Sequence, residues 1–246
     1  VPVVIKPIKI IKSEKPVVTK KETLTNQKIM KMIKSIRKSM PDTEEQINKI
    51  SISESRVFIN GPTGSGKELI ARKIHKNSSR NKSPFIVLNG ALLDSNKYEL
   101  ELFGEEKSNG SISYGALEKA NKGTLLIDQV SEIPLDIQSK ILRVLIDQKF
   151  KRVNGSNDIS VDVRLICSSS KDLKDEIRIG NFREDLYYRL LGLPIELPPL
   201  RDRGSDVLIL AKYFVTEFCK ENKMPEINIS KEAQEKLLAY PFPGNV

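Results

Sequence analysis

Apolar and polar residues follow two different spacings along this chain. Four short apolar runs are typical of buried strands: 56–60, 85–88, 124–128 and 161–167. Apolar residues at intervals of three and four predict helices between or beside these runs: 69–74, 98–103 and 134–145. The inner side of the last helix is expected to carry Leu135, Ile137, Ile141, Leu142 and Leu145. Strands that alternate with helices predict a mostly parallel sheet, which binds its ligands at the carboxyl ends of the strands.

The pattern is different at both ends of the chain. Residues 1–21 mix Val and Ile with Lys and three prolines, which excludes a helix and indicates an extended segment. Residues 24–40 have apolar positions at helical spacing, whereas 42–55 are polar and favour no element. After Pro198-Pro199 only helical patterns occur, at 207–220 and 231–240, which predicts a small helical subdomain.

The most informative segment is 61–68, Gly-Pro-Thr-Gly-Ser-Gly-Lys-Glu, between a predicted strand and a predicted helix. Its glycines let backbone N–H groups turn inward around an anion, and the N-terminus of the following helix adds partial positive charge. Lys67 is placed to reach the β- and γ-phosphates of a nucleotide. Glu68 stands where the general motif has a Ser or Thr that holds Mg²⁺. A flexible Gly/Ser turn is the alternative interpretation.

Asp128 ends an apolar run, which is the position expected of a carboxylate that holds Mg²⁺ beside a phosphate-binding loop. The next residue, Gln129, stands where a Glu usually polarises the attacking water. An amide cannot accept a proton as a carboxylate does, and general-base help contributes about 10²–10⁴-fold to a rate. We therefore predict slow hydrolysis. The alternative is that Gln129 positions the water, as a Gln does in some GTPases.

Composition narrows the class of protein. The chain has 246 residues, a net charge of +9 and a pI near 9.4, and we interpret this charge mainly as a solvated lysine-rich surface. Cys167 and Cys219 have no metal or redox spacing, which fits a reducing cytoplasm. No run of about 18 apolar residues and no signal peptide is visible, so we expect a cytoplasmic location and no membrane partner. The chain begins at Val1 rather than Met, and we interpret it as a fragment of a longer protein.

Eight segments occur in one order between Ser55 and Val246: 61–68, 99–104, 115–120, 120–128, 141–145, 182–190, 197–201 and 243–246. With these segments the chain resembles the central AAA+ domain of sigma-54-dependent response regulators, the NtrC class, and is most similar to the NtrX branch. The resemblance implies an α/β AAA+ P-loop fold, a three-layer sandwich with a mostly parallel sheet, followed by a small helical lid. It also implies ATP and Mg²⁺ as cofactors, and it accounts for Glu68, since this family normally has Glu there.

The resemblance extends the candidate nucleotide site to the family's second ATP signature, 120–129. The implied nucleotide-binding residues are Gly61, Pro62, Thr63, Gly64, Ser65, Gly66, Lys67, Glu68, Ala120, Asn121, Lys122, Gly123, Thr124, Leu125, Leu126, Ile127, Asp128 and Gln129. The implied catalytic residues are Lys67, Asp128, Gln129, Arg183 and Arg189, with Asp128 as the Mg²⁺ ligand.

Four further positions match family residues with defined roles. Arg183 and Arg189 match two arginines that reach the γ-phosphate of a neighbouring subunit, although helix-surface ion pairing is the alternative interpretation. Asn89 matches an Asn that holds the Glu of the Walker-B motif in an inactive pose, a switch that loses its charged partner when Gln129 replaces Glu. Ser170 stands where the family often has a residue that senses the γ-phosphate.

One loop departs from the family pattern. Members that remodel sigma-54 polymerase have a Gly-Ala-Phe-Thr-Gly-Ala loop after Glu-Lys. Here Glu106-Lys107 is followed by Ser-Asn-Gly-Ser-Ile-Ser-Tyr at 108–114, without the Phe-Thr tip. The resemblance implies ring assembly if the chain is active, and a sensor histidine kinase and DNA as partners of domains outside this sequence. Contact with sigma-54 polymerase stays open.

These observations predict three parts and leave three functional hypotheses. The parts are a linker or remnant of a preceding receiver domain at 1–24, a nucleotide-binding α/β subdomain at 25–197, and a truncated helical lid at 198–246. The first hypothesis is an ATP-binding regulator of transcription that acts through nucleotide-dependent assembly with weak turnover. The second is an active ATPase that remodels sigma-54 polymerase, and the third is a degenerate fragment without activity.

Overall fold

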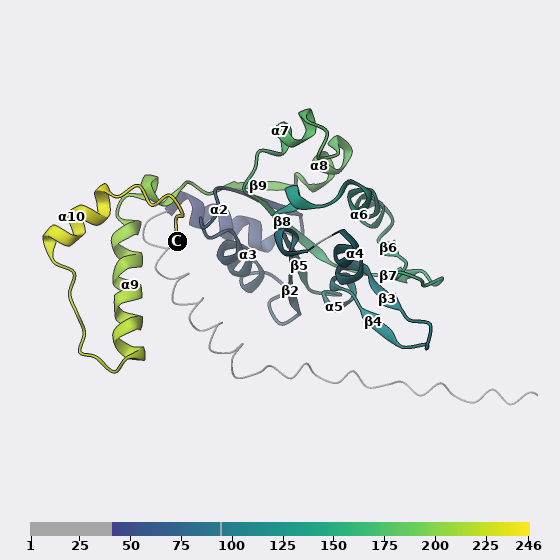
Figure 1. Cartoon of the computed structure of the whole chain (residues 1–246), viewed down its shortest axis with the longest axis horizontal. Helices are drawn as coiled ribbons and strands as arrows, with labels where there is room; N and C mark the ends of the chain where they lie inside the picture. The colour runs from purple at the N-terminus through teal and green to yellow at the C-terminus, as the bar shows by residue number, and fades with distance from the viewer. Residues whose placement is uncertain (1–40, 94) are drawn as a thin grey trace, which may run out of the picture.

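The computed structural model describes residues 41–93 and 95–246, so the predicted linker at 1–24 and the helix expected at 24–40 lie outside the described residues. Figure 1 shows an α/β body from which two helices, α9 (Asp206–Glu221) and α10 (Lys231–Ala239), extend to one side. No helix in the described part of the chain combines the length and apolar character needed to cross a membrane.

A five-stranded parallel sheet forms the centre of the body. Its strands are β1 (Val57–Asn60), β2 (Phe85–Asn89), β5 (Thr124–Asp128), β8 (Arg164–Ser169) and β9 (Leu193–Glu196). They lie in the order β2-β5-β8-β1-β9, and every neighbouring pair is parallel. The predicted strands at 56–60, 85–88 and 124–128 are confirmed, whereas β8 begins at Arg164 rather than 161 and β9 was not predicted.

Helices cover both faces of the sheet, which gives three layers. Successive strand residues point to opposite faces, so Leu126 packs with α2 (Pro41–Ile52) and α3 (Lys67–Lys76), while its neighbours Leu125 and Ile127 pack on the other side. On that other side lie α4 (Ser95–Phe103), α5 (Ala116–Lys119), α6 (Leu135–Asp147) and α8 (Glu184–Leu190). The short helix α7 (Leu173–Arg178) precedes α8.

The buried side of α6 differs from the expected one. Its buried residues are Ile137, Gln138, Ile141 and Val144. Leu135, which was expected to face inward, is 49% exposed. It is the first residue of the helix, where few neighbouring elements cover a side chain.

Two antiparallel hairpins extend the body beyond the main sheet. One joins β3 (Gly104–Glu106) to β4 (Ile112–Tyr114), and the other joins β6 (Lys149–Phe150) to β7 (Ile159–Ser160). The first hairpin contains the loop that departs from the family pattern. Its turn is closed by a hydrogen bond from the Lys107 N–H to the Ser111 carbonyl at 2.9 Å.

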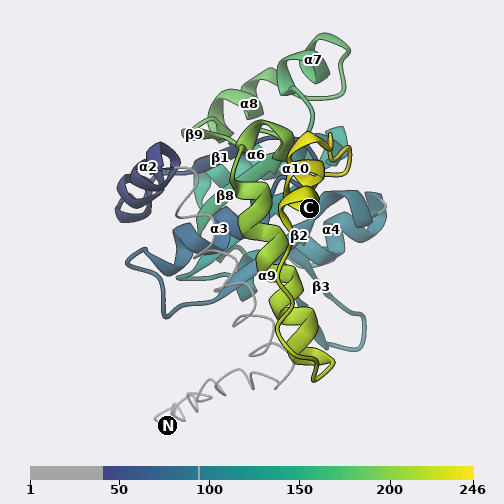
Figure 2. The ribbon, with the colours of Figure 1, turned by 90° about the vertical axis from the view of Figure 1, so that its left-hand side faces the viewer.

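The lid, residues 198–246, has its own small core. Leu200, from the 3-10 helix η3 (Leu200–Arg203), is buried with Val207 and Leu210 of α9, and Leu237 and Phe242 pack against them. Figure 2 shows α9 in front of the body with α10 folded back beside it. The predicted helices at 207–220 and 231–240 are therefore confirmed within one or two residues at each end.

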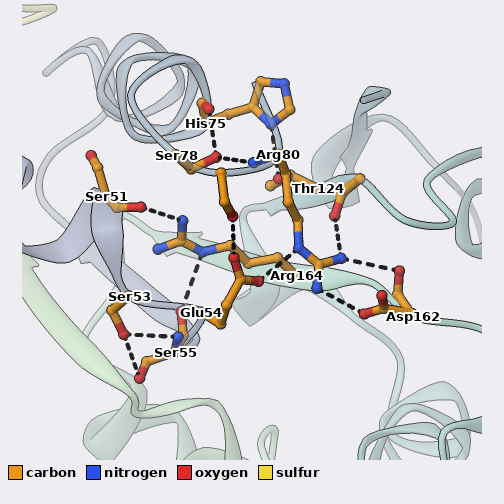
Figure 3. Close-up of polar contacts among 12 residues, drawn as sticks. Ser51, Ser53, Glu54, Ser55, His75, Ser78, Arg80, Thr124, Asp162 and Arg164 are labelled. Carbon is orange, nitrogen blue, oxygen red and sulfur yellow. Dashed lines mark hydrogen bonds and ion pairs between the residues drawn. The ribbon is translucent and has the colours of Figure 1, made fainter. Parts of the chain in front are cut away.

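Arg164 joins the end of α2 to the amino end of β8 (Figure 3). Its side chain is buried and donates to the carbonyls of Ile50 at 2.7 Å and Ser51 at 3.1 Å. Carbonyls in the last turn of a helix have no partner within the helix, so the guanidinium satisfies them. Nearby, Arg80 pairs with both Glu54 and Asp162. The polar segment 42–55, which the sequence left unassigned, is thus held as a helix by contacts made far along the chain.

Candidate functional site

The strand register brings the ends of β1 and β5 to the same edge of the sheet. Phe58 of β1 and Ile127 of β5 both lie opposite Cys167 of β8, which runs between them. Asp128 therefore ends β5 near the level at which β1 leads into residues 61–68, the phosphate-binding loop. This register places the loop and Asp128 at one edge of the sheet, as the sequence predicted.

The phosphate-binding loop has the backbone shape of an anion nest. Gly61, Gly64 and Gly66 have φ angles of +153°, +76° and +93°, which favour glycine, and α3 begins directly afterwards at Lys67. In the described part of the chain, the N–H groups of Gly64 and Gly66 make no hydrogen bond. Free N–H groups beside a helix N-terminus are the donors that bind phosphate in such loops.

Lys67 and Ser65 are buried side chains of the loop, and neither pairs with an anionic group among residues 41–93 and 95–246. The Lys67 ammonium is buried and donates to the carbonyls of Gly61 at 2.8 Å and Pro62 at 3.1 Å. Burial lowers the pKa of Lys67, and the charge of Asp128 acts in the opposite direction. The Ser65 hydroxyl is buried and has no hydrogen-bond partner within the part of the chain that the structure describes. A phosphate group would supply acceptors for these donors, so the loop fits a nucleotide.

Asp128 is held by hydroxyl and amide groups from the strands on either side. One carboxylate oxygen accepts a hydrogen bond from the Ser168 hydroxyl, and the other accepts from the Asn89 amide at 3.5 Å. Asn89 was expected to contact the residue that follows Asp128. In this structure its amide meets Asp128, because Asn89 and Asp128 lie opposite each other in the β2–β5 ladder.

Gln129 is held by Ser170 instead. The Gln129 side-chain oxygen accepts hydrogen bonds from the Ser170 N–H at 3.1 Å and the Ser170 hydroxyl at 2.8 Å. The backbone of Gln129 is left-handed, with φ 59° and ψ 58°, and its carbonyl approaches Gly90 so closely that a Cβ there would lie 2.7 Å away. A non-glycine residue in this region costs about 1–3 kcal/mol, and such strain is concentrated at functional sites.

The predicted second ATP signature, 120–129, runs along β5 toward the edge of the sheet that carries the loop. β5 enters the sheet at Thr124, whose backbone N–H donates to the Pro84 carbonyl at the opposite edge from the loop. Ala120, Leu125, Leu126 and Ile127 are buried in the core. Only Asp128 and Gln129 of this segment reach the edge that carries the loop, because a five-residue strand spans about 13 Å at 3.3 Å per residue. The structure thus places Ala120, Asn121, Lys122, Gly123, Thr124, Leu125, Leu126 and Ile127 before that edge, and their contact with a nucleotide stays a prediction.

Arg183 lies directly before α8 and Arg189 lies within it, and neither joins the site of its own chain. Arg183 pairs with Asp185 at 2.7 Å, and Arg189 is exposed. No hydrogen bond or ion pair in residues 41–93 and 95–246 links either guanidinium to Lys67 or Asp128. Their role toward a neighbouring subunit stays a prediction.

Glu68 is engaged beside the loop. Its carboxylate pairs with Arg72 one helical turn later, at 2.7 Å. Among the described residues there is no group of three or more His, Cys, Asp or Glu side chains arranged to hold a metal ion. This suits Mg²⁺ in a nucleotide site, where one or two carboxylates and the phosphates share the ion. The role of Asp128 as a Mg²⁺ ligand stays a prediction.

Sequence reasoning assigned no role to two lid residues that contact the loop. The Asn245 amide donates to the Thr63 carbonyl at 2.7 Å, and the Arg203 guanidinium donates to the Ser65 carbonyl at 2.6 Å. Asn245 belongs to the Pro-Gly-Asn-Val segment that carries part of the resemblance, which was the available signal. Nothing in the pattern around Arg203 indicated that a charged side chain would be buried.

Two family models match adjacent parts of the chain. The model of the Sigma-54 interaction domain matches residues 33–196, and that of the AAA+ ATPase lid domain matches residues 201–246. The chain belongs to the Sigma-54 interaction domain family. The predicted resemblance and the predicted AAA+ fold with a C-terminal lid are thereby confirmed.

Curated relatives of this family member are regulators. The regulatory protein AtoC of Escherichia coli K12 is 44% identical over 212 residues, which are 85% of this chain and 46% of AtoC. The nitrogen assimilation regulatory protein NtrX of Azorhizobium caulinodans is 40% identical over 201 residues, which are 81% of this chain and 44% of that protein. The chain thus spans less than half the length of either relative.

Solved structures of NtrX from Brucella abortus have the same fold. One aligns with a TM-score of 0.80 at 38% identity and covers 92% of this chain and 53% of that one. The same protein in complex with ATP aligns with a TM-score of 0.79 at 36% identity, covering 92% of this chain and 54% of that one. These alignments include both the α/β body and the lid.

Proposed function

We propose that this chain is the ATP-binding module of a two-component response regulator that controls transcription through nucleotide-dependent assembly, with weak hydrolysis. The observation that carries the proposal is the phosphate-binding loop, with its free N–H groups and its buried Lys67 folded onto two carbonyls. The ATP complex of the related Brucella NtrX supports the choice of nucleotide. Interaction with a sensor histidine kinase and binding of DNA would belong to segments outside these residues.

Each site residue has a defined task in this proposal. Lys67 leaves the Gly61 and Pro62 carbonyls and neutralises phosphate charge, while the N–H groups of Gly64 and Gly66 donate to phosphate oxygens. Asp128 supplies the carboxylate for Mg²⁺ that accompanies the phosphates. ATP would bring the phosphoanhydride bond that the chain hydrolyses weakly in this proposal.

Weak hydrolysis follows from Gln129 and its contacts. The amide cannot take a proton from water, and its oxygen is already occupied by the two donors of Ser170. Completion of the site would also need Arg183 and Arg189 from a neighbouring copy, because these residues lie away from Lys67 within one chain. Turnover would therefore depend on assembly.

The hairpin of β3 and β4 argues against standard remodelling of sigma-54 polymerase. The turn between its strands has the sequence Lys-Ser-Asn-Gly-Ser at 107–111, closed by hydrogen bonds and by the Asn109 side chain. It offers no aromatic side chain at its tip. We propose that this loop cannot grip the sigma factor as the Phe-Thr loop of other members does.

The test measures binding, turnover and assembly in one sample. ATP affinity, phosphate release and molar mass with and without nucleotide would be compared for wild type, Lys67→Ala and the surface control Lys82→Ala. The proposal expects micromolar binding, turnover near background and growth in mass with ATP. Binding and the growth in mass should be lost in Lys67→Ala and kept in Lys82→Ala. Brisk turnover together with binding of sigma-54 would favour the active remodelling ATPase, and absence of nucleotide binding would favour a degenerate fragment.

A further inference from the structure

The lid supplies hydrogen-bond donors to three consecutive carbonyls of the phosphate-binding loop. The Thr63 carbonyl accepts from the Asn245 amide at 2.7 Å, the Gly64 carbonyl from the Val246 N–H at 3.2 Å, and the Ser65 carbonyl from Arg203 at 2.6 Å. Figure 1 shows the C-terminus back beside the body near α3 rather than at the far end of the lid helices. The lid therefore holds the loop along its whole turn.

These contacts determine which way the loop N–H groups point. In a trans peptide the C=O and N–H bonds point in opposite directions, and no cis peptide occurs in the described part of the chain. Because three successive carbonyls face the lid, the N–H groups of the next three residues face away from it. Ser65 uses its N–H for a turn to the Pro62 carbonyl at 3.1 Å, and those of Gly64 and Gly66 remain available.

Arg203 and Asn245 are both built into this contact. The Arg203 side chain is 3% exposed, donates twice to the Pro198 carbonyl at 2.7 and 2.9 Å, and faces buried Asp206 at 3.9 Å. Asn245 spans the lid and the loop, since its side-chain oxygen also accepts from the Leu200 N–H at 2.7 Å.

The backbone at Gly64 depends on this contact as well. A Cβ at Gly64 would lie 2.2 Å from the Gly244 carbonyl, so the loop and the lid touch through backbone atoms as well as side chains.

We propose that Arg203 and Asn245 are positioning residues: they hold the loop carbonyls on the lid side and so keep the N–H groups of Gly64 and Gly66 directed at the anion site before any nucleotide is bound. The effect on nucleotide affinity rests on the proposed ATP-binding function, whereas the effect on loop order does not. The lid thus orients the phosphate-binding loop through hydrogen bonds, in addition to covering a bound nucleotide.

The test uses Asn245→Gly in the full 246-residue chain. Asn245 has a φ of +62°, which glycine adopts freely, so the substitution removes the side-chain contacts without backbone strain. Asn154→Gly is the matched control, since Asn154 has a φ of +60° and a single long side-chain bond to Glu105 at 3.4 Å in a distant hairpin. Asn245→Gly also leaves buried Arg203 and Asp206 intact, which avoids the folding risk of an Arg203 variant.

Amide hydrogen exchange without nucleotide gives the first readout. The Leu200 amide loses its acceptor in Asn245→Gly and exchanges faster whether or not the proposal holds, which verifies the substitution. The proposal expects the Ser65 amide, which lies 180 positions before Asn245 in the sequence, to exchange several-fold faster as well. Faster exchange at Leu200 with unchanged exchange at Ser65 would overturn it.

Binding of a fluorescent ADP analogue gives the second readout. The one side-chain hydrogen bond from Asn245 to the loop, to the Thr63 carbonyl, contributes about 0.5–1.5 kcal/mol and predicts up to about tenfold weaker binding in Asn245→Gly and none of this loss in Asn154→Gly. Equal affinity of Asn245→Gly and wild type would refute the positioning role. If wild type itself binds no nucleotide, the proposed function fails, while the Ser65 exchange still decides whether the lid orders the loop.

Discussion

Gln129→Glu is the substitution whose outcome depends most directly on the geometry of the site. It restores the carboxylate that this position commonly has and leaves the size of the side chain unchanged. If only the chemistry of the side chain matters, general-base help would raise turnover by about 10²–10⁴-fold. The contacts of Gln129 with Ser170 change this expectation.

The size of the change can be worked out from those contacts. The side-chain oxygen of residue 129 accepts two hydrogen bonds from Ser170. Hydrogen bonds to a charged acceptor contribute about 1.5–3 kcal/mol each, compared with about 0.5–1.5 for neutral ones, so a carboxylate is held more tightly by roughly 2 kcal/mol in total. The carboxylate must leave Ser170 to act on water, and this cost of roughly 2 kcal/mol lowers the rate about thirtyfold, since each 1.36 kcal/mol is a factor of ten. We therefore expect Gln129→Glu to raise kcat by roughly three- to 300-fold.

The assay is phosphate release at saturating ATP, with nucleotide affinity measured in the same preparations. Adding Ser170→Ala to Gln129→Glu removes one of the two donors and is expected to raise kcat by about fivefold more, equivalent to about 1 kcal/mol. Gln148→Glu is the matched control, because Gln148 is also an amide in the left-handed region, with φ 53°, but lies at the end of α6. A double variant slower than Gln129→Glu, with ATP affinity intact, would refute this reasoning.

Three further predictions concern the loop, a buried imidazole and a buried guanidinium. Gly64→Ala pushes a Cβ into the lid backbone whereas Gly66→Ala meets open space, so both strain the loop but only the former should raise the proteolytic sensitivity of the lid. Burial lowers the pKa of His75 from its usual 6.5, so the unfolded state binds the proton more readily than the folded state. The free energy of unfolding, measured by urea titration, should therefore fall as the pH drops below 6.5 toward the lower folded pKa. The fall should be smaller in His75→Gln. Arg164→Met leaves helix carbonyls without donors and should lower the free energy of unfolding by about 3 kcal/mol, against roughly 0.5 kcal/mol or less for exposed Arg178→Met; equal losses would contradict this account.

The sequence predicted the parts of the fold that local pattern determines. The buried runs at 85–88 and 124–128 became β2 and β5 because their apolar residues pack on both faces of a covered sheet. The helix α2 was missed because its polar sequence does not indicate a helix. The carbonyls in its last turn accept hydrogen bonds from Arg164, more than 100 positions later. The strand β9 was missed for a similar reason, as Pro194 interrupts a short run that is stabilised by pairing with β1.

The candidate site was predicted in part. That the phosphate-binding loop and Asp128 share one edge was predictable, because both follow the carboxyl ends of strands in a parallel sheet. The partner of Gln129 was not predictable, because Asn89 and Ser170 are both polar residues near strand ends and only the register decides between them. The contribution of Arg203 was invisible for the same reason, since a charged residue near a Pro-Pro turn is usually at the surface.

β8 connects two features that were described separately. Its first residue, Arg164, holds the end of α2, while Ser168 holds Asp128 and Ser170, just beyond its last residue, holds Gln129. The strand lies between β5 and β1, so it cannot slide along its axis without breaking both ladders. The end of α2 and the side chains of Asp128 and Gln129 are therefore attached to the same strand, and a displacement of β8 would shift all three together.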